Sequence, residues 1–252
     1  MIELKNVALS YGHKQVLNDI NLTLADTGLT SIIGPNGSGK SSCLSLMSRL
    51  QKASAGEVLL DNCPIQQIPA NQLAKKLSIL RQDNHTNARI QVKDLITFGR
   101  YPYHQGRPSE QDLKIVEQCI EYVDLRDVQD RFIDQLSGGQ RQRVFIAMVL
   151  AQGTRTILLD EPLNNLDIKH SVSIMKQLRK TCDELNKQVV VVLHDINFAA
   201  HYSDTIIALK NGEVIANGSP AEIMQDSVLS HIYDMPITVT DIQGKPTCLF
   251  YS

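Results

Sequence analysis

One short stretch constrains the fold of this chain more than any other: Gly34-Pro35-Asn36-Gly37-Ser38-Gly39-Lys40-Ser41-Ser42. It matches the pattern G-x-x-x-x-G-K-[ST], in which backbone N–H groups curl around phosphate oxygens and the lysine neutralises the outermost ones. An apolar run at 29–33 precedes it, and apolar residues at helical spacing follow it over 43–50. A strand, a glycine loop and a helix in this order place an anion at a helix N-terminus. The sequence therefore predicts a nucleotide-phosphate site, with Lys40 on the β- and γ-phosphates and Ser41 on Mg²⁺; a glycine-rich connection without a ligand is the alternative.

Composition sets the broad class of protein. The 252 residues are 42% hydrophobic and 21% charged, as in ordinary soluble globular proteins. The net charge of −2, from 25 basic and 27 acidic residues, disfavours nucleic acid as a partner because it leaves no basic footprint. The five cysteines stand far apart without a C-x-x-C pair, which favours reduced structural thiols over disulfides or zinc ligands.

The distribution of apolar residues bears on location. Residues 1–6 carry charges where a secretory signal would be apolar, so we expect the chain to stay in the cytoplasm. The longest uninterrupted apolar run, at 144–151, is far shorter than the roughly 20 residues needed to span a bilayer. Any membrane association is therefore expected to go through a partner.

Strand and helix patterns alternate along the chain. Residues 2–10 and 16–24 read as strands, which predicts a β-rich entry to an α/β domain. The pattern turns helical from residue 83 to 135, and includes a helix at 109–123 with Ser109 as its cap and Asp112 at the capping-box position. We interpret this block as a helical lobe inserted in the domain. The aromatic and proline-rich stretch 101–108 is expected to be an exposed docking loop, with ordinary loop packing as the competitor.

Polar residues follow several of the predicted strands. Asp160 and Glu161 end the apolar strand 156–159, an arrangement expected of a magnesium-holding aspartate beside a water-activating glutamate. His194 ends the apolar strand 188–193, on the edge where ligands of parallel sheets bind. Gln82 ends a short strand and is placed to reach a metal-bound water, although a solvated strand terminus is the simpler interpretation. Tyr11 lies in a polar break, where its ring is free to stack on a base or simply to pack.

A second glycine-containing motif has no cation of its own. Leu136-Ser137-Gly138-Gly139-Gln140 leads into a strongly helical run, and two glycines with a serine at a helix start form an anion-binding nest. Because the motif carries no lysine, it needs a phosphate held elsewhere.

Taken together, these residues resemble the ATP-binding subunits of ABC transporters along essentially the whole chain. The motifs occur in the family's order: Tyr11, the phosphate loop 34–42, Gln82, the signature 136–140, the pair Asp160-Glu161, a loop ending at Asp167, and His194. The stretches 98–103, 136–143 and 193–197 are similar to importers of iron–siderophore, haem and cobalamin, and 161–167 resembles siderophore members, especially those for catecholate-type chelates. Many family members carry Ser or Thr where this chain has Asn164 or Asn165, which we expect to affect only cross-subunit contacts.

The resemblance implies a fold, ligands and roles. The expected fold is a single ABC ATPase domain over 1–252, with a P-loop NTPase core of mostly parallel sheet, an N-terminal antiparallel β subdomain and a helical subdomain at 83–152. ATP and Mg²⁺ are the implied ligands. The residues expected to bind ATP are Tyr11, Asn36, Gly37, Ser38, Gly39, Lys40, Ser41, Ser42, Ser137, Gly138, Gly139 and Gln140. Those expected at Mg²⁺ are Ser41, Gln82 and Asp160, and those expected in catalysis are Gln82, His194 and, as the base, Glu161.

The resemblance also implies partners. Two copies would face each other head to tail, so that the signature of one covers the ATP of the other, and the helical lobe would take up two permease subunits served indirectly by a substrate-binding protein. The chain would then be peripheral, on the cytoplasmic face of the inner membrane, and would energise import of a ferric siderophore. A cobalamin or haem importer, an exporter subunit and a non-transport ABC ATPase are the alternatives.

Overall fold

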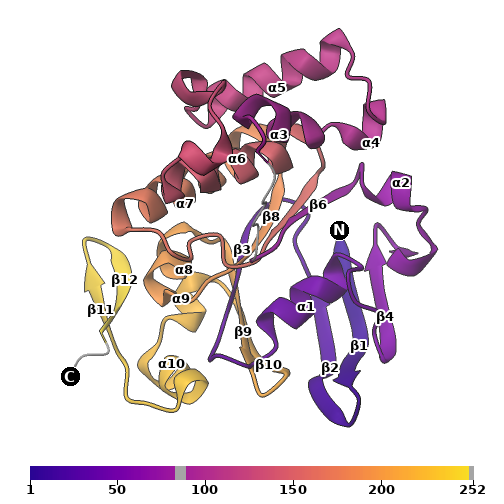
Figure 1. Cartoon of the computed structure of the whole chain (residues 1–252). Coiled ribbons are helices and arrows are strands. Elements are labelled where there is room, and N and C mark those ends of the chain that lie inside the picture. Colours follow the sequence, from indigo (N-terminus) through magenta and orange to yellow (C-terminus); the bar gives the residue numbers. More distant parts are fainter. Residues whose placement is uncertain (83–88, 250–252) are drawn as a thin grey trace. The chain divides into compact units, whose positions relative to one another are not determined.

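The computed structural model describes residues 1–82 and 89–249, which form two units (Figure 1). The first unit consists of Met1–Ile68 and Leu178–Ser252, and the second of Pro69–Gln177. Helix α7 (Ile168–Leu185) runs from the second unit into the first. Within the described ranges, none of the helices combines the length and the apolar character needed to cross a bilayer.

An antiparallel sheet opens the first unit. Its strand order is β2-β1-β4-β5, with β1 (Ile2–Tyr11), β2 (Lys14–Thr23), β4 (Ala55–Leu60) and β5 (Cys63–Pro64), followed by a 3₁₀ turn, η1 (Ile65–Gln67). The alternation of buried and exposed residues along β1 and β2 explains the two strands, since one face packs on the core. The predicted β-rich entry is confirmed, and Tyr11 is the last residue of β1 instead of lying in a break.

The same unit contains a second set of strands. Their order is β10-β9-β3-β8, with β3 (Gly28–Ile33), β8 (Gln188–Val192), β9 (Thr205–Lys210) and β10 (Glu213–Gly218). Of these, β3, β8 and β9 are mostly buried and β10 is partly exposed. Strand β3 pairs in parallel with β8 and β9, and every residue of β8 is buried, as a run of valines predicts. The remaining elements are α1 (Lys40–Met47), α8 (Ile196–Tyr202), α9 (Pro220–Ile223), α10 (Asp226–Tyr233) and the hairpin β11 (Thr238–Ile242) to β12 (Lys245–Leu249).

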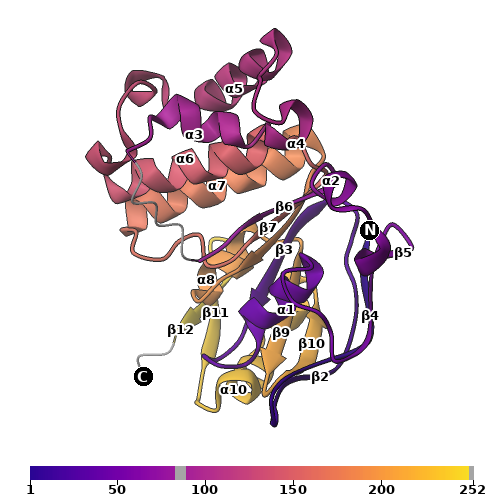
Figure 2. The ribbon, with the colours of Figure 1, turned by 45° about the vertical axis from the view of Figure 1, so that its right-hand side comes forward.

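The second unit combines a parallel strand pair with helices. Strands β6 (Leu77–Leu80) and β7 (Thr156–Leu159) pair in parallel. The helical elements are α2 (Ala70–Leu73), α3 (Val92–Phe98), α4 (Tyr101–His104), α5 (Glu110–Tyr122), η2 (Arg126–Val128), η3 (Ile133–Gln135) and α6 (Gly138–Ala151). Figure 2 shows α3, α5 and α6 packed side by side. Residues 83–88 of the predicted lobe lie outside the described residues, and its bounds of 83–152 stay a prediction.

The stretch 101–108 differs from the expected loop, because its first four residues form α4. Pro102 lies in the first turn, where a helix needs no N–H donor, so the proline does not prevent the helix. The predicted cap of the next helix is confirmed: the Ser109 hydroxyl accepts from Asp112 N, and Asp112 Oδ2 accepts from Ser109 N at 3.0 Å.

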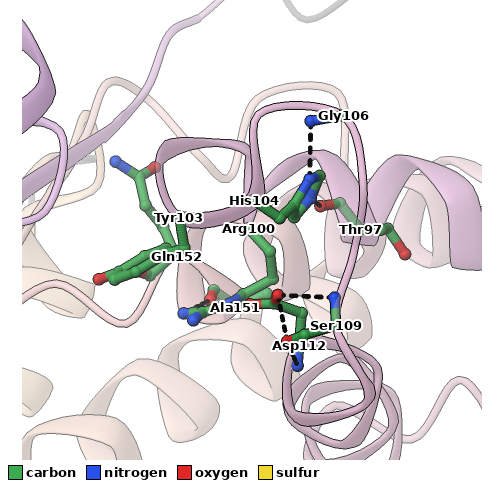
Figure 3. Close-up of polar contacts among 9 residues, drawn as sticks. All are labelled: Thr97, Arg100, Tyr103, His104, Gly106, Ser109, Asp112, Ala151 and Gln152. Atoms are coloured by element: carbon green, nitrogen blue, oxygen red, sulfur yellow. Dashed lines mark hydrogen bonds and ion pairs between the residues drawn. The ribbon is translucent and has the colours of Figure 1, made fainter.

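Arg100 ties α4 and α5 to the end of α6 (Figure 3). Its Nε donates to Asp112 Oδ1 at 2.9 Å, its Nη1 donates to the carbonyl oxygen of Ala151 at 3.0 Å, and its guanidinium lies 3.8 Å from the Tyr103 ring centroid. The Ser109 hydroxyl, with the Ser109 N–H and Arg100, lowers the pKa of the buried Asp112 carboxyl to about 2 against the opposing effect of burial. The ion pair is therefore desolvated and geometrically fixed.

We expect Arg100→Met to lower the free energy of unfolding by about 3 kcal/mol, because it leaves the Asp112 carboxylate buried without its partner. Urea unfolding at neutral pH measures the loss, with Arg107→Met, at an exposed arginine, as the matched control. Folding depresses the Asp112 pKa below its ordinary value of about 4, so its contribution is present above that pH and is lost as the pH falls toward 2. Asp112→Asn should therefore lose less stability than wild type between about pH 5 and about pH 3. Equal losses would contradict this account.

Candidate active site

The phosphate loop joins β3 to α1 in a conformation that requires glycine. Gly34 has φ 141°, and a Cβ placed on it would lie 2.0 Å from the carbonyl oxygen of Leu209. Gly39, which precedes α1, has φ 101°, and its Cβ would lie 2.5 Å from Leu17 Cδ2. Other residues avoid such positive φ values, so backbone conformation and close packing both explain the glycine spacing of the motif.

Two side chains of the loop fit a bound phosphate. Lys40 is buried, and its Nζ donates to the carbonyl oxygens of Gly34 at 3.0 Å and Pro35 at 2.9 Å, which holds the ammonium group at the loop. The Ser38 Oγ is also buried and has no hydrogen-bond partner within the described residues. Buried hydroxyl groups are almost always hydrogen-bonded, so this one is expected to donate a hydrogen bond to a ligand. Phosphate oxygens can accept it.

His194 lies at the same strand edge as the phosphate loop. In the parallel register Ile32 is opposite Val192, and Leu193 N donates to the Ile32 carbonyl oxygen at 3.1 Å. Gly34 and His194 each lie two residues beyond this pair, so the two residues follow their strands at the same edge of the sheet, as the sequence predicts. His194 is exposed, and Asp195 directly after it caps α8 by accepting from Asn197 N at 2.8 Å.

Tyr11, also in the first unit, ends β1 opposite Lys14 and is 48% exposed. The residue is accessible to a ligand, and stacking of its ring on adenine stays a prediction.

The second unit brings Gln82 and the acidic pair together. Leu80 is opposite Leu159, and Asp160 N donates to the Leu80 carbonyl oxygen at 2.9 Å, so both strands end at the same level. Gln82 Nε2 then donates to Glu161 Oε2 at 2.7 Å. Glu161 takes φ 49°, an uncommon conformation for a non-glycine residue, while Asp160 is almost fully buried.

Asn164 is a contact of the site that sequence reasoning missed. Its Nδ2 donates to the same Glu161 Oε2 that accepts from Gln82. We expected the asparagines at 164 and 165 to matter only for contacts between subunits, but Asn164 contacts the candidate base within the chain. The signal for this contact in the sequence was the spacing of three residues between Glu161, at a turn, and Asn164.

The signature residues begin α6. The Ser137 hydroxyl accepts from Gln140 N at 3.3 Å, and Gln140 Oε1 accepts from Ser137 N at 3.1 Å, which forms a capping box. Ser137 and Gly138 are exposed, whereas Gly139 is buried. The signature thus lies at the N-terminus of a 14-residue helix, where the helix dipole favours an anion, and its role as an anion-binding nest stays a prediction.

The oxygen donors suit magnesium. The Ser41 hydroxyl belongs to the first unit, and the Asp160 carboxylate and Gln82 amide belong to the second. Among the described residues no group of three or more His, Cys, Asp or Glu side chains forms a metal site. Oxygen donors of this kind fit Mg²⁺ better than a tightly caged metal, because Mg²⁺ is usually held by one or two carboxylates together with substrate phosphates.

Residues 17–164 match the family described as ABC transporter. The chain belongs to this family. The ABC ATPase is 51% identical over 252 residues, 100% of both chains, to the petrobactin import ATP-binding protein YclP of Bacillus subtilis (strain 168). It is 36% identical over 246 residues, 96% of this chain and 91% of the relative, to the ferric enterobactin transport ATP-binding protein FepC of Escherichia coli (strain K12).

A solved structure confirms the predicted ABC ATPase fold. The dimeric ATP-binding cassette MJ0796, in a post-hydrolysis state bound to ADP and Pi, is similar with a TM-score of 0.76 and 34% identity, over 87% of this chain and 99% of that one. The predicted class, an α/β ATPase with an N-terminal antiparallel sheet, therefore stands.

We expect Lys40→Ala to weaken ATP binding by about tenfold or more, because a charged hydrogen-bond donor is lost from the phosphate loop of the ABC ATPase. Isothermal titration calorimetry with the purified chain measures the affinity. Lys52→Ala, at an exposed lysine of the same unit, is the matched control. Unchanged affinity in Lys40→Ala would remove Lys40 from the phosphate site.

For Asn164→Ala we expect kcat for ATP hydrolysis to fall by up to about tenfold with little change in KM, because Glu161 loses one of two amide donors that orient it. Asn164→Asp, of the same size, should lose more, since it sets a carboxylate against a carboxylate. Steady-state ATPase assays test the order. Wild-type turnover in both variants would show that Asn164 does not orient the base.

Proposed function

We propose that this ABC ATPase hydrolyses ATP to energise import of a ferric siderophore through a membrane permease. The main support for a ferric siderophore as substrate is the full-length identity of 51% with a petrobactin import ATP-binding protein. The 36% identity with a ferric enterobactin transport ATP-binding protein agrees with it. The residues of the chain support the reaction, because the chain carries a phosphate loop, an oriented glutamate and a signature helix.

Two copies of the chain are proposed to close head to tail on two ATP molecules. Support comes from the dimeric state of the MJ0796 cassette and from the signature at 137–140, which has no lysine of its own. In this arrangement Tyr11 stacks on adenine, residues 36–42 hold the phosphates, and Ser137 to Gln140 of the partner copy cover the γ-phosphate. His194 contacts the same γ-phosphate from the edge it shares with Gly34.

Hydrolysis requires that water be activated and that phosphate charge be balanced. Glu161 accepts a hydrogen bond from the attacking water as the base, and Gln82 orients both the water and the carboxylate. Ser41, Asp160 and Gln82 would hold Mg²⁺, which when bound supplies positive charge to the phosphates. Lys40 supplies a second positive charge from the loop.

The permease is proposed to dock on the second unit. Phe98 is 54% exposed at the end of α3 and Tyr101 is 56% exposed at the start of α4, while the buried Arg100 between them fixes both helices. Exposed aromatic residues on a rigid support are typical of a protein interface. Docking there on two permease subunits would place the chain on the cytoplasmic face of the membrane, and a substrate-binding protein would select the chelate.

Uptake of labelled substrates tests the function. Cells that carry Glu161→Gln as their only copy should lose uptake of ferric petrobactin or ferric enterobactin and keep uptake of haem and cobalamin. The purified variant should still bind ATP and form a nucleotide-bound dimer, because only water activation is removed. Glu184→Gln, at an exposed glutamate of α7, is the matched control and should import normally.

The possible outcomes separate the alternatives. Loss of only haem or cobalamin uptake would keep the ATPase and overturn the siderophore. Loss of export of a labelled solute would favour an exporter, and no transport defect would favour a non-transport ATPase. Wild-type hydrolysis by the purified Glu161→Gln chain would remove Glu161 from the role of base.

A further inference from the structure

His170 contacts two motifs that lie apart in the sequence, the loop that ends at Asp167 and the signature at 136–140. On one side, Asp167 Oδ1 accepts from His170 N at 2.8 Å and lies 2.7 Å from His170 Nδ1. A carboxylate oxygen can only accept, so Nδ1 carries the hydrogen and the ring orientation is fixed. The backbone N–H of His170, followed by its ring nitrogen, holds the pKa of the Asp167 carboxyl below its usual range, which keeps this acceptor ionised.

On the other side, the imidazole ring occupies the space beside Gly139 of the signature. A Cβ placed on Gly139 would lie 2.2 Å from His170 Cδ2 and 2.6 Å from Cγ. Gly139 lies inside α6 and does not have a positive φ, so its backbone conformation is open to any residue. The His170 ring, and not the backbone, therefore demands glycine at this position within the chain.

The neighbouring glycine of the signature differs. A Cβ on Gly138 would meet nothing closer than 3.9 Å, where it would touch Asn165 and Leu166 of the loop before α7. Within the chain there is room for a Cβ atom at Gly138 but not at Gly139. The His170 ring, near the start of α7, thus packs against the start of α6.

We propose that His170 is a positioning residue that holds the signature at the start of α6 in register with the loop at Asp167. The inference rests on the proposed head-to-tail dimer, in which the signature reaches the nucleotide of the partner copy. The hydrogen bond to Asp167 orients the ring, and the ring then sets the place of Gly139. The signature and the Asp167 loop consequently approach the partner as one body.

Because the His170 ring is partly exposed, its positioning role can be distinguished from a contribution to the stability of the core. The His170 side chain is 35% exposed and that of Asp167 is 63% exposed, so their contact adds little to the stability of the fold. Displacing the signature by a fraction of an ångström would still lower turnover strongly, since catalytic rates depend steeply on positioning. His170 variants should therefore change dimer formation and kcat without changing thermal stability or nucleotide binding by a single subunit.

Three substitutions separate the two contacts. His170→Ala removes both, His170→Phe keeps a ring beside Gly139 but not the bond to Asp167, and His170→Asn keeps a donor near the position of Nδ1 but not the ring. In a Glu161→Gln background we expect His170→Ala to weaken ATP-driven dimerisation by roughly tenfold, and in the wild-type background to lower kcat by a similar factor. ADP affinity and the melting temperature should stay near wild type, and His170→Phe should recover more activity than His170→Ala.

A double substitution tests the steric fit directly. Gly139→Ala should impair dimerisation because its methyl group meets the ring, and adding His170→Ala should restore it to the level of His170→Ala alone. Gly138→Ala, whatever its own effect, should gain nothing from His170→Ala, because no ring stands in its way. Analytical ultracentrifugation with ATP, and ATPase assays, provide both readouts.

The outcomes separate this inference from the proposed function. If Glu161→Gln with an intact His170 forms no ATP-dependent dimer, the head-to-tail dimer is wrong, and the positioning role falls with it. If that dimer forms and His170→Ala matches it in dimerisation and kcat, the role of His170 alone is overturned. Equal impairment of Gly139→Ala with and without His170 would likewise overturn it.

Discussion

The register of two parallel strand pairs is the constraint on which both parts of the candidate site depend. In the first unit β3 and β8 end at the same level, which sets the phosphate loop beside His194. In the second, β6 and β7 end together, which sets Gln82 beside Glu161. A slip of one residue would turn these side chains to opposite faces. The strands are fixed because they are apolar and largely buried, so packing of the core determines the geometry of the chemistry.

The features that could be predicted from the sequence are those set by neighbours along the chain. The phosphate loop, the capping box at Ser109 and the buried strands β7 and β8 each arise from a local pattern, and each is present. A capping box needs only two side chains three residues apart, so their spacing almost fixes the contact. The likeness to known ATPases then supplied roles that no local pattern contains, above all a partner for the signature.

Contacts between distant segments could not be predicted in the same way. Arg100 binds the carbonyl oxygen of Ala151, and His170 lies against Gly139, yet no periodicity links these positions. The helix α4 was expected as a loop, because proline and aromatic residues suggested a break; the Arg100 stack on Tyr103 and the tolerance of Pro102 in a first turn override that signal. These residues belong to a lobe whose fold is decided by tertiary packing instead of propensity.

Two amide donors meet at the same oxygen of Glu161, one from Gln82 and one from Asn164. Gln82 lies two residues beyond the end of β6, in the unit that carries the exposed aromatic residues of α3 and α4. The two hydrogen bonds come from different segments, so loss of the Gln82 side chain would remove one of them and leave the bond from Asn164. Asn164 comes from the loop after β7, which the bond from Asp160 N to Leu80 holds in place. A serine or threonine at 164 would be a shorter donor, so the longer asparagine is suited to reach the Glu161 carboxylate and orient it together with Gln82.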